Sequence, residues 1–219
     1  MRLLVSVVGG PSAKPFVSMC TNSLVIQSRL PDDTRYTLDG VTRPRYVLAN
    51  TLENVRRLDP SPEDIIVTVD ADDWLCRRDA LEQVYAAHSN GAWVTYGSWV
   101  SNRRDYPAGL PPYDPGANVR QAEWRATQLR SWRYGLLQRI KPRDLRDENG
   151  DLFTCCPDLA IMIPAIEMAG WGRVTYICDP IYFYNRDSGA AVADTRRKTQ
   201  VKTERLIRSR PKYERIDSL

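Results

Sequence analysis

The stretch at residues 64–75, DIIVTVDADDWL, constrains the fold of this chain more than any other. Its apolar and largely β-branched run at residues 65–69 has the length and composition of a buried parallel strand that is covered on both faces. Three carboxylates, Asp70, Asp72 and Asp73, follow directly. Ligands of open α/β sheets bind beside the carboxyl ends of strands. The stretch therefore predicts an α/β fold with an acidic site at the end of a central strand.

Three acids at one strand end repel each other, and burying them without a counter-ion is costly. A hard cation such as Mg²⁺ or Mn²⁺ prefers carboxylate oxygen and often takes its other ligands from substrate phosphates. The alternative is that Asp72 or Asp73 caps a helix that starts near Trp74. One acid would suffice for a cap, so the cluster favours a divalent metal site.

Length and composition indicate one domain of ordinary globular type. The chain has 219 residues, of which 42% are hydrophobic and 26% charged, and its net charge of +4 suits an anionic ligand such as a nucleotide or nucleic acid. No stretch reaches the about 18 apolar residues of a membrane span. The N-terminal residues have a strand pattern and are not expected to form a signal peptide. Five scattered cysteines without a C-x-x-C pair indicate reduced thiols, so we expect a cytoplasmic protein.

Strand and helix patterns alternate along the chain. We expect strands at residues 2–8, 35–40, 64–69, 92–100 and 176–185, and helices at 16–27, 46–58, 75–88, 158–170 and from 196 to 210. The alternation predicts a single α/β domain with a mostly parallel central sheet flanked by helices. His88 lies near the end of a predicted helix, where it complements the helix dipole, and this structural role is favoured over a catalytic one.

Several patterns in this order resemble one family. Residues 70–75, DADDWL, look like the Asp-x-Asp motif of family 2 glycosyltransferases, which are inverting enzymes with the GT-A fold. Ser23 and Gln27 keep the spacing of that family's first helix. Residues 128–133, QLRSWR, resemble a stretch of form His-Leu-Arg-x-Phe-Arg, with Gln128 in place of His and Trp132 in place of Phe. Residues 180–185 match a Pro-x-Tyr-x-Tyr-Asn pattern, so the resemblance spans nearly the whole chain.

The resemblance implies a role for each candidate site residue. Asp158, before an apolar helix, would be the catalytic base; Asp70, Asp72 and Asp73 would form the metal site; and Asp39, Asp70, Arg43, Arg45 and Arg130 would bind the nucleotide sugar. Within the metal site, Asp72 would coordinate directly, Asp70 would share the metal or contact the ribose, and Asp73 would support them. Each has a simpler interpretation: Asp39-Gly40 as a turn, Arg43 and Arg45 as a solvated loop, Arg130 and Arg133 as a basic helix face, and Asp158 as an N-cap.

The implied reaction moves a sugar, with inversion, from a UDP- or GDP-sugar to an acceptor hydroxyl, with Mn²⁺ or Mg²⁺ as the metal. Residues 1–100 would bind the nucleotide sugar, residues 101–190 would supply the acceptor and catalytic half, and residues 191–219 would form a basic helix and tail. The basic run Arg196, Arg197 and Lys198 is expected to contact an anionic ligand, with a solvated helix face as the alternative. The acceptor is expected to be a glycan, a protein or a hydroxymethylated base in DNA.

Two other functions compete with this interpretation. A nucleotidyltransferase would also use strand-end acids and a metal, and residues 9–14, GGPSAK, are a faint version of its phosphate loop. A non-catalytic nucleic-acid-binding module would suit the basic C-terminal segment and the tryptophans. That module leaves the acidic cluster unexplained.

Overall fold

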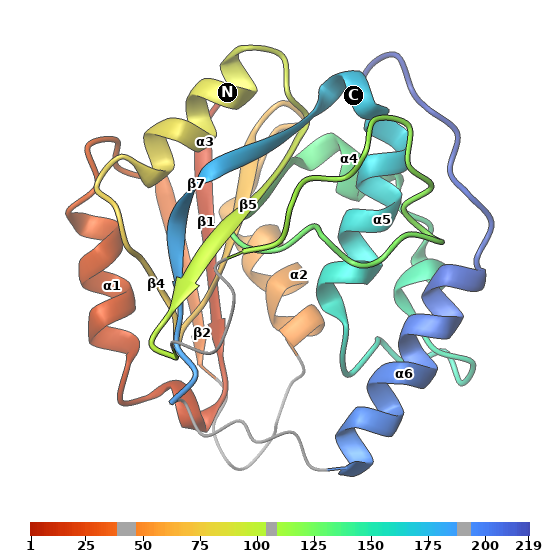
Figure 1. Ribbon diagram of the computed structural model, residues 1–219, viewed down its shortest axis with the longest axis horizontal. Helices are drawn as coiled ribbons and strands as arrows, with labels where there is room; N and C mark the ends of the chain where they lie inside the picture. The colour runs from red at the N-terminus through yellow and green to blue at the C-terminus, as the bar shows by residue number, and fades with distance from the viewer. Residues whose placement is uncertain (39–46, 104–108, 188–193) are drawn as a thin grey trace.

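The computed structural model describes residues 1–38, 47–103, 109–187 and 194–219. Within these residues the strands form one seven-stranded sheet in the order β2-β1-β3-β6-β5-β7-β4 (Figure 1). The strands are β1 (Leu3–Gly9), β2 (Asp33–Leu38), β3 (Ile65–Asp70), β4 (Trp74–Leu75), β5 (Val94–Ser101), β6 (Arg130–Arg133) and β7 (Val174–Tyr184). The strand that carries the acidic motif, β3, lies near the middle of the sheet.

Most strands of this sheet run in one direction. β1 is parallel to β2 and β3, and β5 is parallel to β7, whereas β6 is antiparallel to both β3 and β5, and β4 is antiparallel to β7. Strands β1, β2, β3, β5 and β7 therefore share a direction, which confirms the predicted α/β class with a mostly parallel sheet. The antiparallel insertion of β6 pairs Arg130 with Thr68. It thereby places the start of β6 beside the carboxyl end of β3.

Helices cover both faces of the sheet. They are α1 (Val17–Val25), α2 (Val47–Leu58), α3 (Ala80–Ser89), α4 (Tyr134–Arg139), α5 (Pro157–Ala169) and α6 (Asp194–Ser209), with 3-10 turns at Pro11–Ala13, Pro142–Leu145 and Trp171–Arg173. Figure 1 shows α1 and α3 on one side of the sheet, α2 and α5 on the other, and α6 outside α5. No helix in the described ranges combines the length and apolar character needed to cross a membrane.

The two hydrophobic clusters follow from the alternation of side chains along the strands. In β1, Leu4 packs in the cluster with α2 and α5, whereas Leu3 and Val5 pack in the cluster with α1 and α3. In β3, Ile66 and Ile65 divide between the clusters in the same way. The near-continuous apolar run predicted a strand covered on both faces, and this is what the structure contains.

The helix expected at residues 75–88 begins later than predicted. Trp74 and Leu75 form β4, which pairs with Phe183 and Tyr182 of β7, and α3 starts only at Ala80. The N-cap interpretation of Asp72 and Asp73 is therefore wrong, because no helix begins at Trp74. The backbone after the acidic motif is instead held by Ser23, whose Oγ accepts a hydrogen bond from the Leu75 N–H at 3.1 Å.

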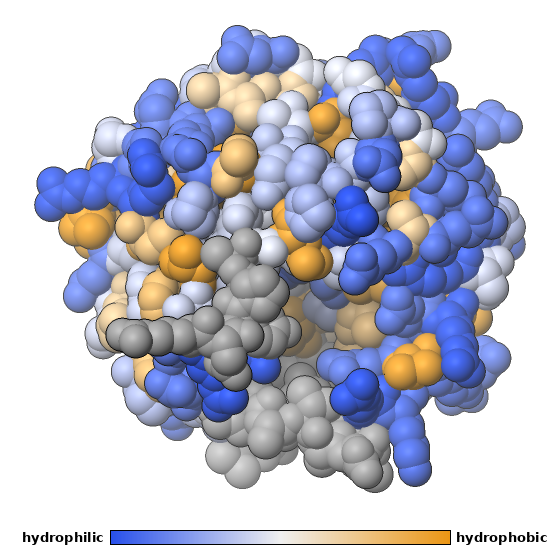
Figure 2. Space-filling view, viewed as in Figure 1, coloured by the Kyte–Doolittle hydropathy of each residue, from blue (hydrophilic) through white to orange (hydrophobic). Residues whose placement is uncertain are grey.

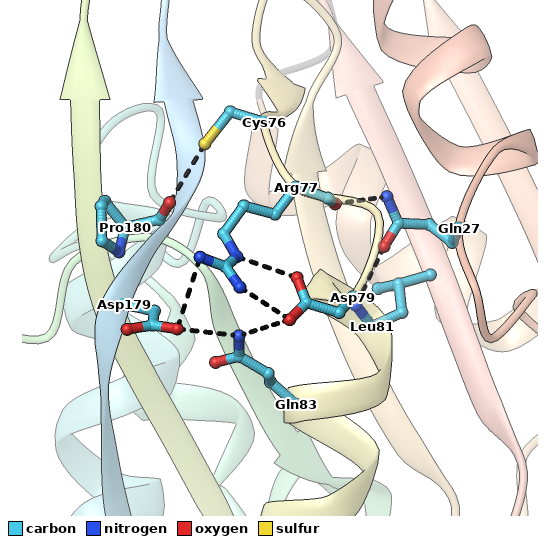
Figure 3. Close-up of polar contacts among 8 residues, drawn as sticks. All are labelled: Gln27, Cys76, Arg77, Asp79, Leu81, Gln83, Asp179 and Pro180. Atoms are coloured by element: carbon cyan, nitrogen blue, oxygen red, sulfur yellow. Dashed lines mark hydrogen bonds and ion pairs between the residues drawn. The ribbon is translucent and has the colours of Figure 1, made fainter.

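A polar network holds the connection between β4 and α3 (Figure 3). Gln27 Nε2 donates to the carbonyl of Arg77 at 2.9 Å, and its Oε1 accepts from the Leu81 N–H at 3.1 Å. Arg77 is ion-paired with Asp79 at 2.9 Å. The Ser23 and Gln27 spacing noted in the sequence thus ties α1 to the segment that follows the acidic motif.

The segment around Arg130 and Arg133 is a strand, so its interpretation as a basic helix face is wrong. Arg133 is 7% exposed and donates to the carbonyl of His88 at 2.9 Å. On the other side of the sheet, Arg120 and Glu167 form a buried bidentate ion pair of 2.7 and 2.8 Å that joins the loop before β6 to α5. All five cysteines are free thiols, as expected.

Candidate active site

The acidic motif lies in a tight turn at the end of β3. The turn is closed by a 3.0 Å hydrogen bond from the Asp73 N–H to the carbonyl of Asp70. The Ala71 N–H donates to the carbonyl of Val8 at 2.8 Å, which binds the turn to the end of β1. Ala71 and Asp73 are buried, whereas Asp70 and Asp72 are partly exposed. The turn therefore buries one of the three acidic residues and leaves the other two partly exposed.

Asp73 is the buried member of the cluster, and its carboxylate contacts β7. Its Oδ1 accepts from the Asn185 N–H and its Oδ2 from the Tyr182 hydroxyl, both at 2.8 Å. The same hydroxyl accepts from the Asp70 N–H at 3.2 Å. Burial, together with the charges of Asp70 and Asp72, raises the pKa of Asp73 to about 8. This carboxylate holds the end of β7 against the acidic turn.

Asp70 faces the other side of the turn, toward β6. Its Oδ2 accepts a 3.0 Å hydrogen bond from Gln128 Nε2, while Gln128 Oε1 accepts from the Arg130 N–H at 3.2 Å. The two bonds fix the orientation of the Gln128 amide. Burial raises the pKa of Asp70, and the charges of Asp72 and Asp158 add to this, against the opposing effects of Arg130 and Gln128.

Asp158 lies in the first turn of α5, where the helix dipole favours an ionised carboxylate. Arg130 Nη1 is 3.1 Å from Asp158 Oδ2. The side chains of Arg130 and Asp158 are 14% and 22% exposed, so the pair is shielded but reachable. A cavity of about 30 Å³ between β1, β3, β6 and the starts of α2 and α5 has Asp70, Arg130 and Asp158 in its lining. Three candidate residues from distant parts of the sequence therefore meet in one place.

Some other candidates lie outside the described residues, and His88 is buried elsewhere. Asp39, Arg43 and Arg45 lie outside the described residues, and so does the side chain of Arg196. His88 is buried: its ring bonds to Ser131 Oγ at 2.7 Å and to the Ala92 carbonyl at 3.0 Å. Burial, together with the charge of the neighbouring Arg133, lowers the pKa of His88 to about 3. It is a neutral group that fixes β6 to α3, with no access to a substrate.

Sequence reasoning missed the contributions of Gln128, Trp132, Tyr182 and Asn185. Gln128 and Trp132 stood out only as departures from the resembled pattern, and both prove to border the carboxylates. Tyr182 and Asn185 belong to the Pro-x-Tyr-x-Tyr-Asn pattern, whose polar atoms bond to Asp73. That pattern was the available signal for these two residues.

The carboxylates fit a divalent cation in one respect and not in another. Burial and the mutual repulsion of the carboxylates raise the pKa values of Asp70 and Asp73, and a hard cation would relieve this repulsion. In the described part of the chain, however, no three acidic, histidine or cysteine side chains converge as a complete set of metal ligands. The residues therefore fit an ion held by one or two carboxylates, with the remaining ligands supplied by water and substrate phosphate.

The sheet order and the helical layers define a GT-A-like α/β domain. The structures it resembles include S. aureus TarS residues 1–349 in complex with UDP-GlcNAc, with a TM-score of 0.58 and 14% identity over 91% of this chain and 64% of that chain. The complex of the same TarS segment with UDP gives a TM-score of 0.55 and 14% identity over 84% of this chain and 60% of that chain.

A further TarS structure aligns with a TM-score of 0.53 and 15% identity over 84% of this chain and 37% of that chain. This chain therefore spans less than two thirds of the TarS chains that it matches. At these identities the likeness shows the fold. No protein-family profile matches the chain, and no curated protein matches its sequence.

Proposed function

We propose that the chain is a metal-dependent inverting glycosyltransferase that takes its sugar from a UDP- or GDP-sugar. The observation that carries the proposal is the meeting of Asp70, Arg130 and Asp158 around one cavity at the carboxyl end of the sheet. The shared fold with TarS, whose structures hold UDP-GlcNAc and UDP, supports a nucleotide sugar as the ligand of this end of the sheet.

Asp158 is proposed as the general base. An acceptor hydroxyl gives its proton to the Asp158 carboxylate as its oxygen attacks the anomeric carbon, and the bond from that carbon to the diphosphate oxygen breaks. Attack opposite the leaving group inverts the configuration at this carbon. Arg130 holds Asp158 Oδ2 in place and lies beside Asp70, so its guanidinium is available to the departing diphosphate.

Asp72, with Asp70, is proposed to hold Mn²⁺ or Mg²⁺. Bound there, the ion would neutralise charge on the departing diphosphate. Asp73 is proposed to support the other two, because Tyr182 and Asn185 already bond to both of its oxygens. From their positions in the sequence, we also propose contacts for three other residues. Asp39 would contact the nucleotide base, and Arg43 and Arg45 the diphosphate.

The competing functions fit the geometry less well. A phosphate loop at residues 9–14 would need its glycines for close approach of a ligand. A Cβ on Gly9 would instead lie 2.6 Å from the Ala71 Cβ, so this glycine has a packing reason. A nucleic-acid-binding module leaves the paired carboxylates and Arg130 without a role. The acceptor is proposed to be a glycan, a protein or a hydroxymethylated base in DNA.

A thermal-shift screen of UDP- and GDP-sugars tests the proposal. A ligand that binds only the folded state raises the unfolding temperature by mass action. We expect one nucleotide sugar to stabilise the protein in Mn²⁺ and to lose most of this effect in EDTA. Stabilisation by DNA, in the absence of any effect of nucleotide sugars, would contradict the proposal and favour the binding module.

A further inference from the structure

Trp132 has a buried hydrogen-bond donor that the fold does not use. The residue is 2% exposed in β6, and its Nε1 has no hydrogen-bond partner in the described part of the chain. Most buried N–H groups in native proteins are paired, because leaving one without a partner is costly. Trp132 lines the same cavity as Asp70, Arg130 and Asp158. A group bound in this cavity is therefore a candidate partner.

The cavity limits what that group is. Its water-accessible volume of about 30 Å³ has room for a small polar group such as a hydroxyl. Ile161 and Met162 contribute apolar wall, while two carboxylates and one guanidinium contribute charge. A phosphate oxygen would face Asp70 and Asp158 at a cost. A sugar hydroxyl both donates to a carboxylate and accepts from an N–H, so it matches this lining.

We propose that the Trp132 indole N–H donates a hydrogen bond to a hydroxyl of the transferred sugar. The inference rests on the proposed function, because the cavity lies between the metal-side carboxylate Asp70 and the base Asp158. That is where the transferred sugar must lie, whereas the nucleoside binds farther from the base. Trp132 would then distinguish a nucleotide sugar from the free nucleoside diphosphate.

The test is the variant Trp132→Phe, which removes the N–H and keeps an aromatic ring. Phe is also the residue in the resembled sequence stretch. Calorimetric titrations with UDP and with UDP-GlcNAc in Mn²⁺, and with GDP and GDP-mannose, measure affinity for each nucleotide with and without its sugar. We expect affinity for the sugar-bearing partner to fall about three- to tenfold, the range of one hydrogen bond, while affinity for the free diphosphate is unchanged.

The ratio of the two affinities, and not the unfolding temperature, separates a binding role from a structural one. Trp132 is buried, so the smaller ring of Phe should lower the unfolding temperature through lost packing alone. Trp171→Phe is the matched control, since Trp171 Nε1 donates to the Ala117 carbonyl at 3.1 Å. This control should lower the unfolding temperature and leave the ratio of the two affinities unchanged.

Two results would overturn the inference. An equal loss of affinity for the free diphosphate and for the nucleotide sugar would show that Trp132 does not contact the sugar. Unchanged affinities for all four nucleotides, at any unfolding temperature, would show that Trp132 serves only the packing of the core. Failure of the proposed function is a different result, in which the wild-type protein itself binds none of the four nucleotides.

Discussion

Asp70, Asp72 and Asp73 carry the same side chain in three different surroundings. Asp70 bonds to Gln128, Asp73 is enclosed by Tyr182 and Asn185, and Asp72 is partly exposed between them. The cluster and its place at a strand end were predictable from residue types alone. The partners that hold Asp73 were not, because they lie more than 100 residues from it in the sequence.

The different surroundings of Asp73 and Asp72 predict different effects of replacing each residue by Ala. Asp73→Ala leaves the Tyr182 hydroxyl and the Asn185 N–H without their acceptor, so it should lower the free energy of unfolding by about 1–3 kcal/mol. Asp72→Ala should change it by less than about 0.5 kcal/mol, yet remove the Mn²⁺-dependent part of nucleotide binding. Urea denaturation and calorimetry measure the two effects. Equal loss of stability in both variants would contradict the assignment.

His88 predicts how stability depends on pH. Its pKa is about 3 in the folded protein and about 6.5 when unfolded, so the unfolded state binds an extra proton between these values. The free energy of unfolding is therefore highest above pH about 6.5 and falls as the pH drops. At pH about 4.5 the loss has reached about 2–3 kcal/mol.

The variant His88→Asn isolates this effect from other titrating groups. It should be less stable at neutral pH, because Ser131 and Ala92 lose their hydrogen-bond partner. Between pH about 6.5 and 4.5, its free energy of unfolding should also fall less steeply than that of the wild type. The difference in slope corresponds to up to one proton bound on unfolding. Parallel pH profiles for the two proteins, from urea denaturation, would show that His88 does not titrate on unfolding.

At the scale of elements, strands with strong apolar runs were predictable and short polar strands were not. β3 and β1 appear in the sequence as continuous apolar runs, and the structure places them side by side. β6 contains Arg130 and Arg133, and only its pairing with β3 and β5 makes it a strand. Likewise, Trp74 and Leu75 join the sheet through β7 and not through local preference.

The contact between β1 and the acidic turn predicts a sharp difference between two neighbouring glycines. A Cβ on Gly9 would lie 2.6 Å from the Ala71 Cβ and 2.8 Å from the Ala13 Cβ, whereas a Cβ on Gly10 meets nothing within 4 Å. Gly9→Ala should therefore destabilise the protein by about 1–3 kcal/mol and weaken nucleotide binding by displacing the turn. Gly10→Ala is the control and should resemble the wild type in both measurements.

For the whole molecule, the acids that directly follow a strand predicted a candidate site at the carboxyl end of the sheet. Asp70, Arg130 and Asp158 meet because of the sheet order, in which β6 lies between β3 and β5. No local sequence pattern predicts that position of β6. Residue types indicated the candidates, and three-dimensional contacts decided which of them meet.

The basic face of α6 is the largest charged feature outside the site. Arg197, Lys198, Val201, Lys202 and Arg205 are exposed and line one groove, and Figure 2 shows a mostly hydrophilic surface over α6. Lys198 and Lys202 are like charges one turn apart, which slightly destabilises a helix. Lys202 is paired with Glu148 at 2.8 Å.

Binding of anionic ligands at low salt tests this face. The double variant Arg197→Gln with Lys198→Gln should weaken binding of the nucleotide sugar or of DNA, most clearly at low salt, where exposed charges are least screened. Arg56→Gln with Arg57→Gln removes the same charge from α2, where both arginines pair with Glu53. If both double variants bind these anionic ligands as tightly as the wild type, the α6 residues form only a solvated helix face.

The central claim is that Asp158 acts as a base toward a bound nucleotide sugar, and one measurement tests it most directly. This is the rate at which nucleoside diphosphate is released in Mn²⁺ from the nucleotide sugar that stabilises the protein, for the wild type and for Asp158→Asn. The variant keeps the shape and much of the capping ability of the side chain. It should bind the donor normally and release diphosphate about 100- to 10,000-fold more slowly. An unchanged rate per folded molecule, with lowered stability, would contradict the claim and leave Asp158 as a helix cap.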